Sequence, residues 1–120
     1  MLGSNEIGYV AGSKIAAEMD TFIDALKKVV PNSEIIILAI TGVTAEHEKT
    51  KIENMANINE YNSLLKKLAQ EKNHGFIDVC SVLLDSTGYL SAQYAEKDGL
   101  HLKSGAFKVM LNHIQNQLIQ

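Results

Sequence analysis

The sequence contains one cysteine, one proline and no tryptophan among its 120 residues. A single cysteine, Cys80, excludes a disulfide within the chain and a metal site built from several thiolates. We interpret Cys80 as a buried core residue at the end of a strand. Lysine and arginine (11) are outnumbered by aspartate and glutamate (14), for a net charge of −3. This charge, with no cluster of basic and aromatic residues, argues against a surface for nucleic acid or for anionic membranes.

Long apolar runs are also missing. The longest, Ile35–Ile40, is far shorter than the roughly 20 residues that a membrane-spanning helix needs. The first residues show no basic region followed by an apolar one, so we expect no signal peptide and, by default, a cytoplasmic location. The length and an apolar content of 46% indicate one small domain, residues 1–120, without repeats or linkers.

Apolar residues recur at helical spacing in three stretches of the chain. We expect Ser13 to cap the first helix and Pro31 to end it, and Ser104 to cap the third. The sequence Asn73-His74-Gly75 should cap the end of the second, which gives His74 no catalytic part. The predicted apolar faces are Ile15, Met19, Phe22, Ile23, Leu26 and Val30; Met55, Ile58, Tyr61, Leu64, Leu65 and Leu68; and Phe107, Met110, Leu111, Ile114 and Leu118.

Two stretches predict strands. Glu34–Ile40 is a continuous apolar run rich in isoleucine and bounded by turn residues, typical of a strand buried on both faces of a parallel sheet. Phe76–Cys80 predicts a shorter strand nearer a sheet edge. The order strand, helix, strand makes a right-handed parallel crossover the default. The predicted fold class is therefore α/β, with helices covering a parallel sheet.

A polar stretch, Thr44–Glu53, separates the first strand from the second helix and is interpreted as a loop or a frayed helix start. It contains His47 between Glu46 and Glu48, and both histidine and glutamate can bind metals. Adjacent side chains diverge on any regular element. We therefore interpret His47 as a solvated residue with no ligand.

The most suggestive pattern is an aspartate, Asp98, three residues before a histidine, His101, in a turn that contains glycine. This spacing lets the carboxylate reach one imidazole nitrogen, which fixes the tautomer and leaves the other nitrogen free to take a proton from a nucleophile. A surface turn in which the pair only caps a helix is the alternative, and the four-residue pattern does not separate the two. The long irregular stretch from Leu84 to Lys97 that precedes it is typical of a site.

Three features then occur in order: Gly3-Ser4-Asn5-Glu6 after a short apolar stub, the strand–helix–strand segment, and Asp98-Gly99-Leu100-His101-Leu102 before the last helix. Together they resemble the second half of an SGNH hydrolase, the GDSL family of esterases and lipases. Glu6 stands where the family has aspartate.

The resemblance implies a flavodoxin-like three-layer sandwich. It implies Asp98 as the triad acid, His101 as the base and Asn5 as an oxyanion donor, with a small-molecule ester as substrate and no metal or organic cofactor. The expected sheet agrees, because ligands of open parallel sheets bind beyond the carboxyl ends of the strands. Both motifs follow strands at that edge.

The family's serine-bearing first block and glycine-bearing second block do not occur in this chain. We expect none of the serines present to replace the nucleophile; they are Ser4, Ser13, Ser33, Ser63, Ser81, Ser86, Ser91 and Ser104. The chain is therefore expected to be the C-terminal half of such a domain, with its N-terminal strands missing, and a very poor esterase alone.

Exposed strand edges and helix faces then predict a homo-oligomer, or completion by a missing N-terminal segment. Two alternatives stay open: a non-catalytic α/β domain that associates or binds a ligand, and an α/β interaction domain whose motifs match by chance.

Overall fold

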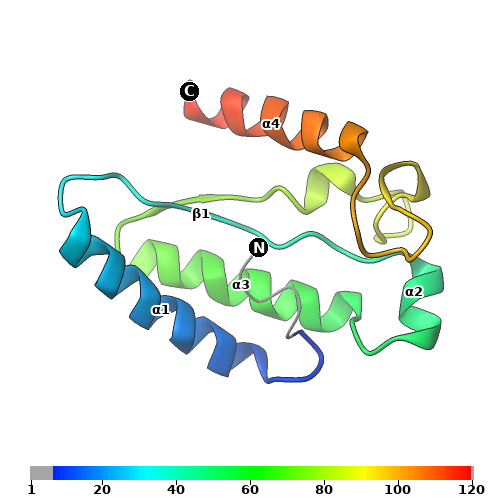
Figure 1. The fold of residues 1–120 in the computed structure, drawn as a ribbon, viewed down its shortest axis with the longest axis horizontal. Helices are drawn as coiled ribbons and strands as arrows, with labels where there is room; N and C mark the ends of the chain where they lie inside the picture. The colour runs from blue at the N-terminus through cyan, green and yellow to red at the C-terminus, as the bar shows by residue number, and fades with distance from the viewer. Residues whose placement is uncertain (1–6, 120) are drawn as a thin grey trace.

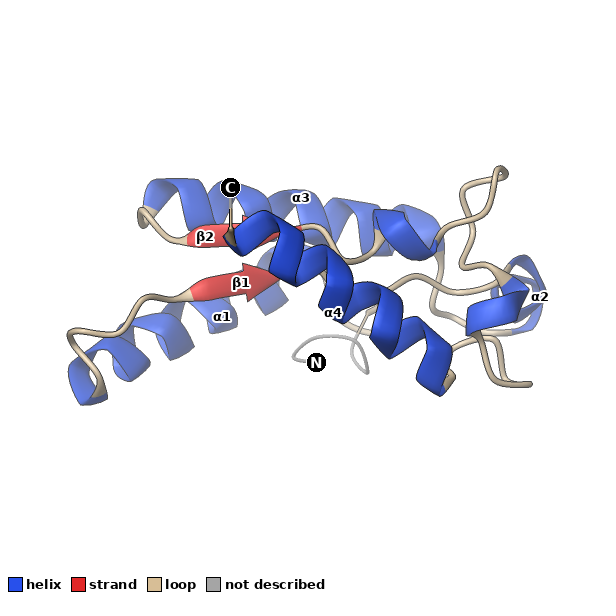
Figure 2. Cartoon of the chain, turned by 90° about the horizontal axis from the view of Figure 1, so that it is seen from above, coloured by secondary structure: helices blue, strands red, loops and turns tan. Residues whose placement is uncertain are grey.

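Two short parallel strands lie between two layers of helices in the computed structural model, which describes residues 7–119 (Figure 1). The helices are α1 (Gly12–Val29), α2 (Ala45–Thr50), α3 (Met55–Glu71) and α4 (Ser104–Leu118), with two 3-10 turns, η1 (Ser81–Leu83) and η2 (Ala92–Tyr94). The strands are β1 (Ile36–Leu38) and β2 (Gly75–Ile77). Figures 1 and 2 show α1 and α3 on one face of the strands and α4 crossing the other. The α/β prediction is confirmed.

The strands pair in parallel, as predicted, with Ile37 opposite Phe76. Asn62 of α3 holds the chain just beyond β1: its side-chain oxygen accepts the Ile40 N–H at 2.8 Å, and its side-chain nitrogen donates to the Ile40 carbonyl at 3.0 Å. Satisfying both backbone groups of one residue fixes where the chain leaves the sheet. The carboxyl ends of both strands therefore point toward α2 and the long loop (Figure 2).

The three long helices are confirmed, but two of the expected caps are wrong. Ala11 is the N-cap of α1 and Lys103 that of α4, and neither makes a side-chain capping bond. Ser13 and Ser104 instead lie inside their helices. The expected cap after α3 is present: Asn73 has a φ of 59°, and the His74 N–H donates to the Ala69 carbonyl at 2.8 Å, as in a helix end closed by a left-handed residue.

The predicted strand Glu34–Ile40 is shorter than expected and is not buried on both faces. Ile37 is buried, but Leu38 is 36% exposed. The predicted strand Phe76–Cys80 also ends early, at Ile77. Helix α4 packs chiefly against η1 and η2, so it leaves part of the face of β1 uncovered. Cys80 lies in the core as expected, where burial raises the pKa of its thiol to about 11.

Several apolar side chains that were predicted to pack are exposed. On α4, Phe107 is 51% and Leu111 61% exposed, whereas Met110 is buried. On α1, Phe22 is exposed beside an apolar groove of about 270 Å³ that runs along β1 and includes Leu26 and Leu38. Part of each apolar face of α1 and α4 thus lacks a packing partner within residues 7–119, while Ile15, Ile23 and Met110 are buried. None of the helices in this part of the chain is long and apolar enough to cross a membrane.

Candidate functional site

The Asp98–His101 turn lies at the end of the fold toward which the strands point. Two backbone bonds close it: the Glu96 N–H donates to the His101 carbonyl at 2.8 Å, and the Gly99 N–H to the Glu96 carbonyl at 2.9 Å. Gly99 has a φ of 73°, a conformation that glycine adopts without the strain other residues meet. The sequence therefore forms a tight loop whose tip carries the acid and the histidine.

The Asp98 carboxylate binds His101 and the turn itself. One oxygen accepts the N–H groups of Leu100 and His101, both at 2.9 Å, and the other lies 2.5 Å from His101 Nδ1. The hydrogen bond from His101, with the two backbone N–H groups, lowers the pKa of Asp98 to about 2. The carboxylate is therefore ionised at neutral pH and can only accept, so Nδ1–H is the donor.

The other imidazole nitrogen, Nε2, has no partner among the described residues. The His101 side chain is 75% exposed, and no hydrogen bond reaches Nε2 from within residues 7–119. An imidazole with Nδ1–H bound to a carboxylate and Nε2 open to solvent can take a proton from an approaching hydroxyl. The structure thus places Asp98 against Nδ1 of His101, the contact that the sequence pattern predicts.

The start of helix α2 is hydrogen-bonded to the Asp98–His101 turn. The Thr44 N–H donates to the Gly99 carbonyl at 3.0 Å, and His47 Nδ1 lies 2.7 Å from the Asp98 carbonyl oxygen. A Cβ on Gly99 would lie 2.2 Å from Thr44 Oγ1 and 2.9 Å from His47 Cβ. Glycine is therefore required for the contact as well as for the φ angle.

The interpretation of His47 as solvated is wrong. Its residue exposure is only 6%, because the start of α2 turns this side chain toward the Asp98 turn while Glu46 stays outside. His47 Nε2 lies 3.0 Å from Glu53 Oε2. Burial favours a higher pKa for Glu53, but the hydrogen bond from His47 and nearby positive charge outweigh it and lower the pKa. The polar neighbours of His47 concealed its role, and no pattern in the sequence marks it.

Asn5, the expected oxyanion donor, lies outside the described residues, as does Ser4. The segment that follows them packs at the same end of the molecule: a Cβ on Gly8 would lie 2.7 Å from the carbonyl oxygen of Ile52. Ile52 precedes Glu53, the partner of His47.

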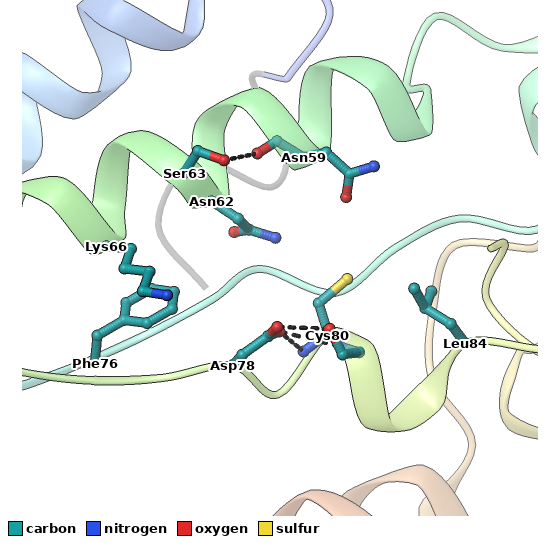
Figure 3. A pocket seen from close by; sticks show the side chains of 9 residues that line it. Asn59, Asn62, Ser63, Lys66, Phe76, Asp78, Cys80 and Leu84 are labelled. Carbon is teal, nitrogen blue, oxygen red and sulfur yellow. Dashed lines mark hydrogen bonds between the residues drawn. The ribbon is translucent and has the colours of Figure 1, made fainter.

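No serine between residues 7 and 119 is hydrogen-bonded to the His101 side chain. Ser63 and Ser81 line a polar groove of about 330 Å³ between α3 and the chain after β2 (Figure 3). The Ser63 hydroxyl donates to the Asn59 carbonyl, and that of Ser81 to Asp78. The groove shares no residue with the Asp98–His101 turn. Within the described part of the chain, no group of three or more histidine, cysteine or acidic residues could hold a metal ion.

Solved structures of esterases and acylhydrolases share this fold. A Streptococcus pneumonia protein provisionally assigned as a platelet activating factor is 26% identical, with a TM-score of 0.86 over 97% of this chain and 56% of that one. A provisionally assigned acylhydrolase from Bacteroides fragilis is 22% identical (TM-score 0.70; 88% and 50% covered). An acetyl esterase is 19% identical (TM-score 0.75; 100% and 55% covered).

The chain spans about half the length of these three proteins. No protein-family model matches it, and no curated protein sequence does.

Proposed function

We propose that this chain is the acid–base half of an SGNH-type ester hydrolase, the C-terminal part of a flavodoxin-like sandwich. One observation carries the proposal: Asp98 holds His101 through Nδ1 and leaves an exposed Nε2 at the carboxyl ends of parallel strands. The esterase-like fold of the structural neighbours supports it. In this proposal Asn5 donates to the oxyanion, and the substrate is a small-molecule ester.

The chemistry is acyl transfer in two steps. His101 Nε2 takes the proton of a serine hydroxyl as the serine oxygen attacks the ester carbonyl, and Asn5 stabilises the negative charge on the carbonyl oxygen. When the tetrahedral intermediate collapses, His101 returns the proton to the departing alcohol. Water then attacks the acyl-serine with His101 again as the base. Asp98 keeps the imidazole in the required tautomer throughout.

The nucleophile is proposed to come from residues outside this chain. The serines at the polar groove make hydrogen bonds to other residues, and none of the described serines is hydrogen-bonded to the His101 side chain. A serine-hydrolase site without one triad member retains only about 10³- to 10⁴-fold acceleration over water. Here a second oxyanion donor is missing too, so the isolated chain should hydrolyse esters more weakly still.

Fluorophosphonate labelling of the purified chain tests this directly. We expect no serine to be labelled, because no serine hydroxyl in residues 7–119 is hydrogen-bonded to His101, and p-nitrophenyl acetate to be hydrolysed close to the buffer rate. Mass spectrometry of the probe-treated protein and a matched His101→Ala chain gives the measurement. Labelling of a serine that disappears with His101→Ala would show that the chain carries its own nucleophile.

A second candidate function is a non-catalytic domain that self-associates. The observation that favours it is the exposed apolar surface of α4, where Phe107, Leu111 and Leu118 lie on one side of the helix. Together with the groove along β1, these exposed side chains are apolar surface of the kind that marks interaction sites on soluble proteins. Self-association is compatible with the hydrolase proposal.

Sedimentation velocity of the doubly substituted chain Phe107→Gln/Leu111→Lys addresses the apolar surface of α4. We expect the native chain to associate at low micromolar concentration, and the variant to associate at least about tenfold more weakly, since large apolar anchors dominate interfaces. Asn112→Lys is the matched control, because it adds the same charge at an exposed position beside that surface. A native chain that stays monomeric would contradict the expectation.

A further inference from the structure

The side chain of His47 is buried, which is unfavourable for a histidine unless its ring nitrogens make hydrogen bonds. No other histidine, carboxylate or ammonium group in residues 7–119 is as deeply buried. A buried polar group costs free energy unless its hydrogen bonds are made. Both ring nitrogens of His47 make one: Nδ1 with the Asp98 carbonyl oxygen at 2.7 Å and Nε2 with Glu53 at 3.0 Å.

The Asp98 carbonyl fixes the proton on one ring nitrogen of His47. A backbone carbonyl can only accept, so Nδ1 must carry a proton and donate. Nε2 lies 3.0 Å from Glu53 Oε2, so the side chain of Glu53 holds the opposite end of the ring. The imidazole is therefore fixed between Glu53 and the turn, with Nδ1–H directed at the Asp98 carbonyl.

Several other charged groups lie near His47. Glu46 and Glu48 precede and follow it on α2; the Glu48 carboxylate accepts the Met55 N–H at 2.9 Å and the Tyr89 O–H at 3.3 Å. The positive charge of Lys51 helps to lower the pKa of Glu53. Asp98 faces His47 with its carbonyl, while its carboxylate is bonded to His101.

The contact between His47 and the turn holds Asp98, the residue that orients His101. His47 binds the carbonyl of Asp98, and the Thr44 N–H binds the next carbonyl, that of Gly99. Thr44 Oγ1 also accepts the His47 N–H at 3.2 Å, so the two contacts share one rigid helix start. Because the carbonyl groups of Asp98 and Gly99 are both hydrogen-bonded, the backbone of Asp98 is fixed. Its carboxylate is therefore positioned to bind His101.

We propose that His47, buried and bridging Glu53 and the Asp98 carbonyl, is a positioning residue that fixes the acid–base turn for ester hydrolysis. The inference rests on the proposed function, because the turn has a base to position only if His101 is one. In this proposal His47 makes no contact with the substrate. It acts only by holding Asp98 in place.

The test uses the full chain with ¹⁵N-labelled histidines, followed by NMR of the ring nitrogens. In the native chain we expect a proton on Nδ1 of His47, hydrogen-bonded to the Asp98 carbonyl, and on His101 the Nδ1–H tautomer at alkaline pH. A His47 ring whose Nδ1 carries no proton would overturn the bridge without any substitution.

Substitutions separate positioning from simple stabilisation. In His47→Leu, which removes both bonds, we expect the Nδ1–H tautomer of His101 to fall by about half or more, since free imidazole no longer has a fixed acceptor. His47→Gln keeps one donor for the Asp98 carbonyl and should retain most of it, while His74→Gln is the control away from the turn. A folded His47→Leu chain with an unchanged His101 tautomer would overturn the proposal. If His47→Leu does not fold, His47→Gln and the native spectrum still decide it.

Asp98→Asn reports on the proposed function separately. It should abolish the tautomer preference of His101 whatever His47 does. An unchanged His101 in Asp98→Asn would mean that the acid–base pair itself fails, a result different from failure at His47 alone.

Discussion

His101→Ala is expected to lower kcat by a factor on the order of 10⁶ in a chimera that joins an N-terminal segment, carrying the family's serine and glycine blocks, to this chain. Without the imidazole the serine keeps its proton and the departing alcohol receives none. Asp98→Asn should cost about 10⁴, because the imidazole is then held in the wrong tautomer. Initial rates on p-nitrophenyl acetate, compared at equal concentrations of folded protein, measure both.

The effect of the two substitutions should not be additive. Asp98 works only through His101, so the double variant should be no slower than His101→Ala within a few-fold. His113→Ala, on α4 and away from the turn, is the matched histidine control. A folded chimera that the probe fails to label, or one that loses less than tenfold activity with His101→Ala, would refute the assignment of His101 as the base.

Gly99→Ala is expected to destabilise the chain by about 2–5 kcal/mol. A non-glycine residue at a left-handed φ costs about 1–2 kcal/mol, and overpacking adds about 1–3 kcal/mol, here because the new methyl would lie 2.2 Å from Thr44 Oγ1. Urea unfolding followed by circular dichroism gives the difference in free energy of unfolding.

Gly88→Ala is the control for the φ effect. Gly88 has a φ of 86°, and a Cβ there would meet nothing within 4 Å, so only the backbone strain of about 1–2 kcal/mol remains. The excess loss in Gly99→Ala measures the contact between the turn and α2. Equal losses in the two variants would show that Thr44 and His47 yield to the methyl and that the close approach is not required.

The local parts of the fold and site follow from sequence pattern. The helices α1, α3 and α4 come from apolar periodicity, and the parallel strands from two apolar runs. The pair Asp98 and His101 is equally local, since three residues separate the partners and the turn's own backbone N–H groups bind the carboxylate.

What could not be predicted depends on contacts between distant segments. His47 looked solvated because its neighbours along the chain are acidic, and only the approach of the Asp98 turn buries it. The exposure of Phe107 and Leu111 is the converse case: periodicity identifies an apolar face but cannot say whether anything covers it. The caps at Ser13 and Ser104 failed because each helix begins one residue or more earlier than the serine side chain requires.

The anchoring of the turn on α2 also has a consequence for the order of folding. The bond between His47 and the Asp98 carbonyl joins residues 51 positions apart, and such a closure must wait until α3 and the strands have brought the segments together. The helix α2 has only six residues, too few to be stable by itself. The acid–base turn and α2 should therefore gain and lose their structure together, as one small cooperative unit that opens more readily than the α1–α3 core.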